Sequence, residues 1–127
     1  MAWVSSSEGS PVERFIQSAV PYRQLDGAEV ASDWNDLIDG TLESGILLTE
    51  TMGAPPKGTT TSCMLDVAFA WSGTQETGVG LPDGDCNDWS DGAGYGFAGW
   101  VGQTDNEWTV ACMANCLDEA TLYCFEQ

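Results

Sequence analysis

The stretch Leu65-Asp66-Val67-Ala68-Phe69-Ala70-Trp71 places a large apolar side chain at every second position. This is the period of a strand with one buried face, because successive side chains of a β-strand point to opposite faces of the sheet. We therefore predict a strand over residues 65–71, the clearest of the chain. The preceding residues 52–58 contain two prolines and two glycines, which predict a loop.

Helix signals lie before this strand. Ser10-Pro11-Val12-Glu13 combines an N-cap serine, a proline at the first helical position and a capping-box glutamate. Apolar residues continue at helical spacing to residue 19, and Pro21 predicts the end of this helix. A second short helix is predicted over residues 31–38, with Gly40 as its terminator.

Short strands are predicted over residues 46–49, 107–112 and 122–125. Residues 73–99 are rich in glycine and aspartate, and a long irregular stretch in a compact domain is usually functional. The chain is thus predicted to be an α+β domain, with a small, mostly antiparallel sheet, two short helices and a long irregular loop region.

Composition excludes several functions. The 127 residues, 43% of them hydrophobic, suit a single domain over residues 1–127. Three basic residues against 20 acidic ones give a net charge of −17, which excludes nucleic acids and anionic membrane surfaces as partners. Without histidine there is no Ser-His or Cys-His nucleophile pair and no His-ligated zinc. No run of about 18 apolar residues is present, so no membrane insertion is expected.

Five cysteines in so short a chain predict disulfides and an extracellular or cell-surface location. The alternative is thiolate ligation of zinc, but a Cys-x3-Cys pair at Cys112 and Cys116 with no second pair is a weak signal for it. An odd number leaves one cysteine without a partner inside the chain. The first eight residues lack the basic and apolar regions of a signal peptide, and we expect the chain to be excised from a longer protein.

Five stretches carry a family pattern: Ala2-Trp3-Val4-Ser5, residues 26–31, Trp71-Ser72-Gly73-Thr74, Cys86-Asn87-Asp88-Trp89 and residues 122–127. Together they resemble a family of bacterial secreted and surface domains of uncharacterised function. The resemblance covers essentially the whole chain, and its last stretch is the most specific. It implies a C-type-lectin-like fold, related in shape to the endostatin domains of collagens.

The resemblance also implies disulfide pairs. Cys116 and Cys124 have the spacing of the last two framework cysteines of many C-type lectin domains. By that likeness Cys86 pairs with Cys116, and Cys63 with Cys112 as an additional pair. Cys124 is then unpaired, because its partner would lie on an N-terminal helix that this chain lacks. The alternative pairs Cys63 with Cys124 and leaves Cys112 free; sequence alone does not choose.

Residues 82–91 form an acidic loop with two open interpretations. Hard cations take six to eight oxygen ligands, which flexible Asp/Gly loops supply. The loop lacks EF-hand spacing, as well as the Glu-Pro-Asn or Gln-Pro-Asp triplet of sugar-linked calcium in lectins. The alternative is Asx turns along a solvated acidic rim. No cofactor is required, and calcium is the one candidate; its predicted ligands are Asp83, Asp85, Asn87, Asp88 and Asp91.

Aromatic residues gather in the same half of the chain. Exposed aromatic faces bind carbohydrate rings and form hot spots for protein partners. Trp71 and Trp89 are expected in the core, whereas Tyr95 and Trp100 follow glycines and are better candidates for exposure. The predicted ligand-binding residues are Tyr95, Trp100, Asp88, Asp91 and Trp108.

These features predict a non-catalytic recognition or adhesion module that binds a carbohydrate or a protein through residues 78–108. The alternative is a structural tip or assembly domain of an oligomeric, for example trimeric, surface fibre. A third hypothesis, a glycoside hydrolase, requires two carboxylates about 5–9 Å apart in an apolar cleft. The acidity has its own alternative explanation in solubility or adaptation to high salt.

Overall fold

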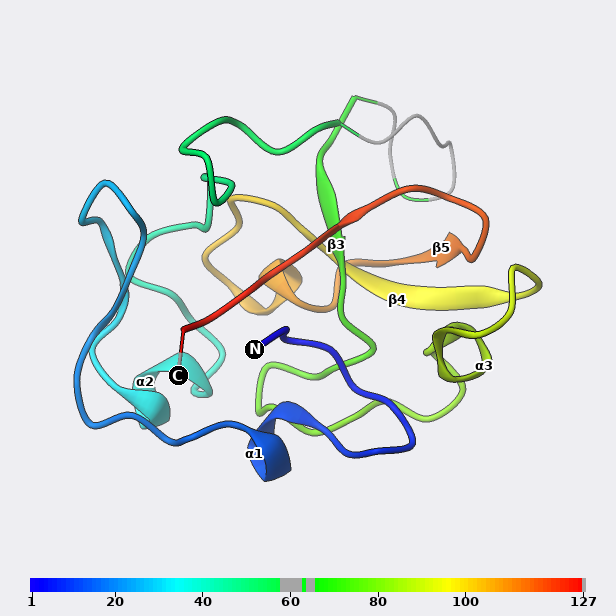
Figure 1. Cartoon of the computed structure of the whole chain (residues 1–127), viewed down its shortest axis with the longest axis horizontal. Coiled ribbons are helices and arrows are strands. Elements are labelled where there is room, and N and C mark those ends of the chain that lie inside the picture. Colours follow the sequence, from blue (N-terminus) through cyan, green and yellow to red (C-terminus); the bar gives the residue numbers. More distant parts are fainter. Residues whose placement is uncertain (58–62, 64–65, 127) are drawn as a thin grey trace.

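A four-stranded sheet forms the centre of the molecule (Figure 1). The computed structural model describes residues 1–57, 63 and 66–126. The strand order is β5-β4-β3-β6, with β3 and β4 antiparallel, β4 and β5 antiparallel, and β3 and β6 parallel. The strands are β3 (Phe69–Trp71), β4 (Tyr95–Trp100), β5 (Cys112–Asn115) and β6 (Thr121–Leu122).

The remaining elements are short. Strands β1 (Tyr22–Arg23) and β2 (Glu29–Ala31) form a separate antiparallel pair. The helical segments are α1 (Pro11–Arg14), α2 (Trp34–Leu37), α3 (Cys86–Trp89) and the 3₁₀ turn η1 (Asn106–Trp108). The α+β class and the mostly antiparallel sheet are thus confirmed. Among the described residues, no helix is long and apolar enough to cross a membrane.

Strand β3 is buried on both faces, which corrects the expected half-buried strand. Phe69 packs with Ala98 and Ala114 on one side, whereas Ala70 belongs to the larger cluster on the other. The strand is also shorter than residues 65–71, because Asp66 has a positive φ of 67° that interrupts extended backbone; Leu65 lies outside the described residues.

Helix α1 begins as predicted and ends early. The capping box between Ser10 and Glu13 is formed, and Pro11 is the first helical residue. The helix nevertheless stops at Arg14, because Phe15 takes an extended conformation and its side chain is buried in the core. The expected continuation to residue 19 is therefore wrong.

Three other local predictions are corrected. Residues 46–49 form no strand. Residues 106–108 turn as η1, so the last long strand begins only at Cys112. The helix predicted over residues 31–38 spans only Trp34–Leu37, because Ala31 is already part of β2. Asp33 is its N-cap and accepts a hydrogen bond from the backbone N–H of Asp36.

The two ends of the chain close the larger core together. The backbone N–H of Trp3 donates to the carbonyl of Tyr123 at 2.8 Å, and Ala2 forms a bridge with Cys124. The Trp3 ring is fully buried, 4.9 Å from the ring of Trp108, and its Nε1 donates to Thr109 Oγ1 at 2.8 Å. The buried members of this cluster are Trp3, Phe15, Tyr22, Val30, Ala31, Trp34, Leu37, Leu42, Ala70, Trp108 and Tyr123.

Truncation of Trp3 tests the role of this end of the chain. We expect Trp3→Ala to lower the free energy of unfolding by about 3–5 kcal/mol, the usual cost of deleting a buried aromatic ring. Denaturant unfolding followed by circular dichroism measures this, with Trp3→Phe as a milder variant. Tyr95→Ala is the control, because its side chain is 55% exposed. Equal stability of Trp3→Ala and Tyr95→Ala would contradict the assignment.

Tyr123 gives a second test. Its hydroxyl is buried with no hydrogen-bond partner among the described residues, and burial raises the pKa of Tyr123 well above that of a free phenol. The neutral form is therefore favoured in the fold, and its contribution to stability, present below about pH 10, declines above that pH as the unfolded chain ionises.

Tyr123→Phe removes both the unpaired hydroxyl and this pH dependence. We expect the variant to be at least as stable as the parent at pH 8 and to gain on it as the pH rises above about 10. Guanidinium unfolding at pH 8 and above about pH 10 measures the difference in stability between the variant and the parent. Both proteins carry Cys124→Ser to prevent disulfide exchange. A large loss of stability at pH 8 would show that the hydroxyl has a partner.

Candidate functional site

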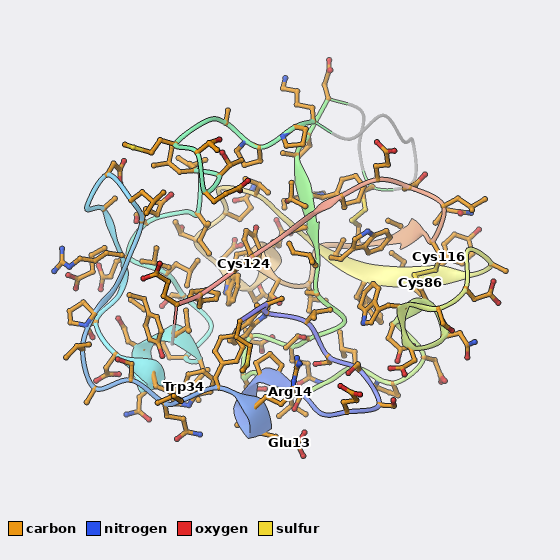
Figure 2. The ribbon with its side chains drawn as sticks, in the orientation of Figure 1. Glu13, Arg14, Trp34, Cys86, Cys116 and Cys124 are labelled. Atoms are coloured by element: carbon orange, nitrogen blue, oxygen red, sulfur yellow. A yellow bond between two sulfur atoms is a disulfide. The ribbon has the colours of Figure 1, made fainter. Side chains whose placement is uncertain are left out.

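Two disulfides fix the second half of the chain. Cys86 is bonded to Cys116, and Cys63 to Cys112, with Cα–Cα distances of 5.6 and 5.4 Å. Cys124 is exposed and free (Figure 2). The two pairs implied by the family resemblance are confirmed, and the alternative Cys63–Cys124 pair is wrong. Two disulfides are consistent with an extracellular location.

The acidic loop contains a backbone turn of unusual hand. Cys86, Asn87, Asp88 and Trp89 all have positive φ, between 52° and 60°, so α3 is not an ordinary right-handed helix. Left-handed backbone costs about 1–2 kcal/mol for each L-residue. Four such residues in sequence persist only if other contacts hold them.

Those contacts come from the N-terminal segment and the sheet. The two carboxylate oxygens of Asp88 accept hydrogen bonds from the Oγ and the backbone N–H of Ser7, both at 2.6 Å. Trp89 Nε1 donates to the carbonyl of Ser5 at 2.7 Å, and the Trp89 ring lies 5.7 Å from that of Trp71. The Cys86–Cys116 disulfide ties the start of the turn to the end of β5. We call this set of contacts the turn anchor.

Asp88 consequently has a structural role, and its assignment as a metal and ligand residue stays a prediction. Each of its two carboxylate oxygens accepts one hydrogen bond from Ser7. These hydrogen bonds, first that of the side chain and then that of the backbone, lower the pKa of Asp88 because they favour the charged form.

A cavity of about 280 Å³ lies beside the turn. Asp83, Asp85, Asn87 and Tyr95 line it, together with Cys86, Ala93 and Gly94. The Tyr95 side chain is 55% exposed. In the described part of the chain, the carboxylates of Asp83 and Asp85 have no hydrogen-bond or ion-pair partner within the protein, so they are free to accept hydrogen bonds from a ligand. We call this cavity, with all of its lining residues, the Tyr95 cavity.

Close packing onto β4 holds the wall of the Tyr95 cavity. The carbonyl of Gly84 accepts a hydrogen bond from the backbone N–H of Phe97 at 2.9 Å. A Cβ atom at Gly84 would lie 2.0 Å from the Phe97 ring, so only glycine fits between Asp83 and Asp85. The two carboxylates are thereby carried by backbone that is pressed against the sheet.

The structure does not bring the other predicted residues to this cavity. Asp91 accepts a hydrogen bond from the backbone N–H of Ala93 at 2.9 Å, and so forms an Asx turn, the alternative given above for the acidic loop. Trp100 is half-buried beside the smaller core cluster. Trp108 is 0% exposed and belongs to the larger core, so its assignment as a ligand-binding residue is wrong. Only three of the five predicted calcium ligands share the cavity, and the described residues contain no group of three or more acidic or cysteine side chains placed to hold a metal ion.

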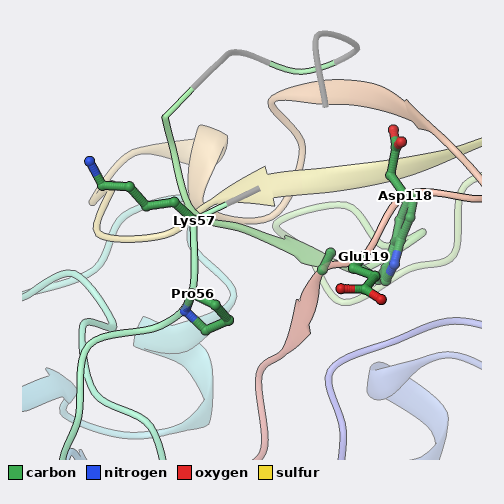
Figure 3. A pocket seen from close by; sticks show the side chains of 6 residues that line it. Pro56, Lys57, Asp118 and Glu119 are labelled. Carbon is green, nitrogen blue, oxygen red and sulfur yellow. The ribbon is translucent and has the colours of Figure 1, made fainter. Parts of the chain in front are cut away.

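A second cavity, of about 430 Å³, was not predicted from the sequence (Figure 3). Its lining comes from the loop before β3, from β3 itself and from the segment before β6: Pro56, Lys57, Trp71, Asp118, Glu119 and Ala120. Trp71, expected in the core, is only half-buried. No spacing in the sequence connects Trp71 with Asp118 and Glu119, so no signal was available to find this group.

Comparisons of the chain with models of protein families, with curated proteins and with solved structures find no match. The family resemblance and the C-type-lectin-like fold therefore stay predictions, and functional inference depends on the geometry of the two cavities.

The hydrogen bonds of Asp88 yield a test of the turn anchor. Asp88→Asn keeps a residue that tolerates positive φ but removes the charge that Ser7 binds. We expect faster amide hydrogen exchange at Ser7 and at residues 86–89, with Asp91→Asn as the control on the same loop. In the parent protein these amides are protected from exchange above the ordinary pKa of an aspartate. The protection is lost as the pH falls through the lowered pKa of Asp88. Unchanged exchange at Ser7 in Asp88→Asn would contradict the assignment.

Proposed function

We propose that this protein is a non-catalytic extracellular recognition module with a C-type-lectin-like fold, and that it binds a carbohydrate in the Tyr95 cavity. The observation that carries this proposal is an exposed aromatic ring beside carboxylates that have no partner within the described part of the chain. A sugar ring offers an apolar face to an aromatic side chain and hydroxyl donors to carboxylates. Both requirements are met by Tyr95 with Asp83 and Asp85.

Rigidity supports the same proposal. Binding is weakened by the entropy lost when loops and side chains become ordered. The Tyr95 cavity is built on backbone held by the Cys86–Cys116 disulfide, by Asp88 through Ser7, and by the packing of Gly84 on Phe97. A ligand therefore meets a surface that is largely preformed, which favours measurable affinity for a small, polar ligand.

Charge narrows the class of carbohydrate. The net charge of −17 and the carboxylates of the cavity repel sulfated or uronic-acid polymers. Neutral oligosaccharides and amino sugars meet no such repulsion. Calcium bound to Asp83, Asp85 and Asn87 is an additional hypothesis, in which the cation would bridge the carboxylates and sugar hydroxyls.

One observation favours the alternative of an assembly or fibre-tip domain. Both edge strands of the four-stranded sheet expose a large apolar side chain, Met113 on β5 and Leu122 on β6. Exposed edge strands pair readily with other chains unless something covers them. Light scattering on the purified protein distinguishes the alternatives, because a trimer supports assembly and a monomer counts against it.

Binding of the parent protein to an array of neutral oligosaccharides and amino sugars tests the carbohydrate proposal. We expect saturable binding that falls at least tenfold in Tyr95→Ala and in the double variant Asp83→Asn/Asp85→Asn. Asparagine tolerates the positive φ of Asp83, so the double variant changes charge without straining the turn. Leu25→Ala, an exposed residue between β1 and β2, and Glu43→Gln are the matched controls.

Two results would overturn the proposal: no binding to any carbohydrate, or full binding by Tyr95→Ala. Repeating the binding measurement with a chelator separates the calcium hypothesis from direct recognition by the carboxylates. Loss of binding with EDTA and its return with calcium support a bridging cation, whereas binding unaffected by EDTA contradicts it and leaves direct recognition by the carboxylates.

A further inference from the structure

The larger cavity has one wall of fixed aromatic surface. Trp71 ends the central strand β3, and its ring lies 5.9 Å from that of Phe69 and 5.7 Å from that of Trp89. Gly96 leaves the space that the indole occupies, since a Cβ atom there would lie 3.0 Å from Trp71 Cζ3. The indole is therefore held in one orientation before any ligand arrives.

Two carboxylates, Asp118 and Glu119, lie in the lining beside the indole. Asp118 Oδ2 accepts a hydrogen bond from the backbone N–H of Asn115 at 3.1 Å, which fixes that side chain. Glu119 is exposed and lies next to it in the lining. Within the described residues neither carboxylate makes an ion pair.

None of the protein's basic residues neutralises this pair of carboxylates in the structure. Arg23 is paired with Glu29, and Arg14 donates to the carbonyl of Val4. Lys57 lines the cavity, but its side chain extends away from the carboxylates of Asp118 and Glu119 (Figure 3). The cavity thus presents negative charge beside an aromatic ring, in a chain whose overall charge is −17.

We propose that this cavity binds an organic cation, an alkylammonium or alkylguanidinium group of the kind that lysine and arginine side chains carry. Such a group is attracted to the π face of an indole and forms charge-assisted hydrogen bonds with carboxylates. The acidic surface as a whole draws cations toward the site and repels anions from it. A bare metal ion gains nothing from the indole, because hard cations take oxygen ligands. This site shares no residue with the Tyr95 cavity, so it stands apart from the proposed carbohydrate site.

Titration with n-butylguanidinium, followed by NMR of the ¹⁵N-labelled protein, tests the proposal. The indole N–H signals are resolved from the backbone amides, and Trp71→Phe assigns the signal of Trp71. We expect a saturable shift of that signal with n-butylguanidinium and none with n-butylurea, its neutral counterpart. Glu119→Gln should weaken binding at least fivefold, whereas Glu43→Gln, an exposed control, should leave it unchanged. Lys57→Met should bind the cation at least as tightly as the parent protein.

Three results would overturn the proposal. Equal binding of n-butylurea would show that charge is not recognised. Unsaturated shifts spread over many acidic residues would show general attraction to an acidic protein and no site. An unchanged affinity in Glu119→Gln, an exposed position at which the variant should fold normally, would show that the carboxylate does not bind the cation. Carbohydrate binding by the same samples reports on the Tyr95 cavity alone, so failure at one site is distinguished from failure at the other.

Discussion

The bond between Cys86 and Cys116 holds together the part of the molecule on which both cavities depend. It joins a four-residue segment of left-handed backbone to the end of β5. L-residues do not keep such a conformation without external support, and here a covalent bond supplies part of it. Cys86 itself lines the Tyr95 cavity, and Asp118 of the larger cavity follows Cys116 by two residues. One crosslink thus lies close in the sequence to residues of both cavities.

Regular secondary structure accounts for little of the order in this domain. The helices are single turns, and several strands are two or three residues long. Order comes instead from side chains that bond to distant backbone. The indole N–H of Trp89 donates to the backbone carbonyl of Ser5, and the hydroxyl of Ser72 donates to the backbone carbonyl of Thr109. A loop-rich protein can be rigid in this way, provided that each such contact is buried or reinforced by its neighbours.

Local signals in the sequence predicted where some elements begin, but not how far they extend. The capping box at Ser10 lies within one turn, so the start of α1 was visible in the sequence, as was the existence of β3. The end of α1 was not visible, because it depends on Phe15 entering a core made by both ends of the chain. The alternation before Trp71 suggested one buried face, but a central strand between two clusters buries both.

The same distinction applies to the candidate site. Asp83, Asp85 and Asn87 share a cavity with Tyr95, as their closeness in the sequence allowed. The role of Asp88 could not be foreseen, because its partner Ser7 is 81 residues away. Trp108 follows two polar residues and yet is buried, because η1 turns its side chain toward Trp3. Long-range packing, which a single sequence does not encode in any spacing, decided the roles of Asp88 and Trp108.

The pairing of the two chain ends has a mechanical consequence. Met1 and Phe125 bond to each other through their backbones, and Trp3 and Tyr123 follow in the same short antiparallel ladder. Tension applied between the two ends would act perpendicular to these strands, so the hydrogen bonds of the ladder would break one after another, starting at Met1 and Phe125. Once the Met1–Phe125 hydrogen bonds have broken, further opening would extract Trp3 from the core, so the domain would yield at low force when pulled from both ends.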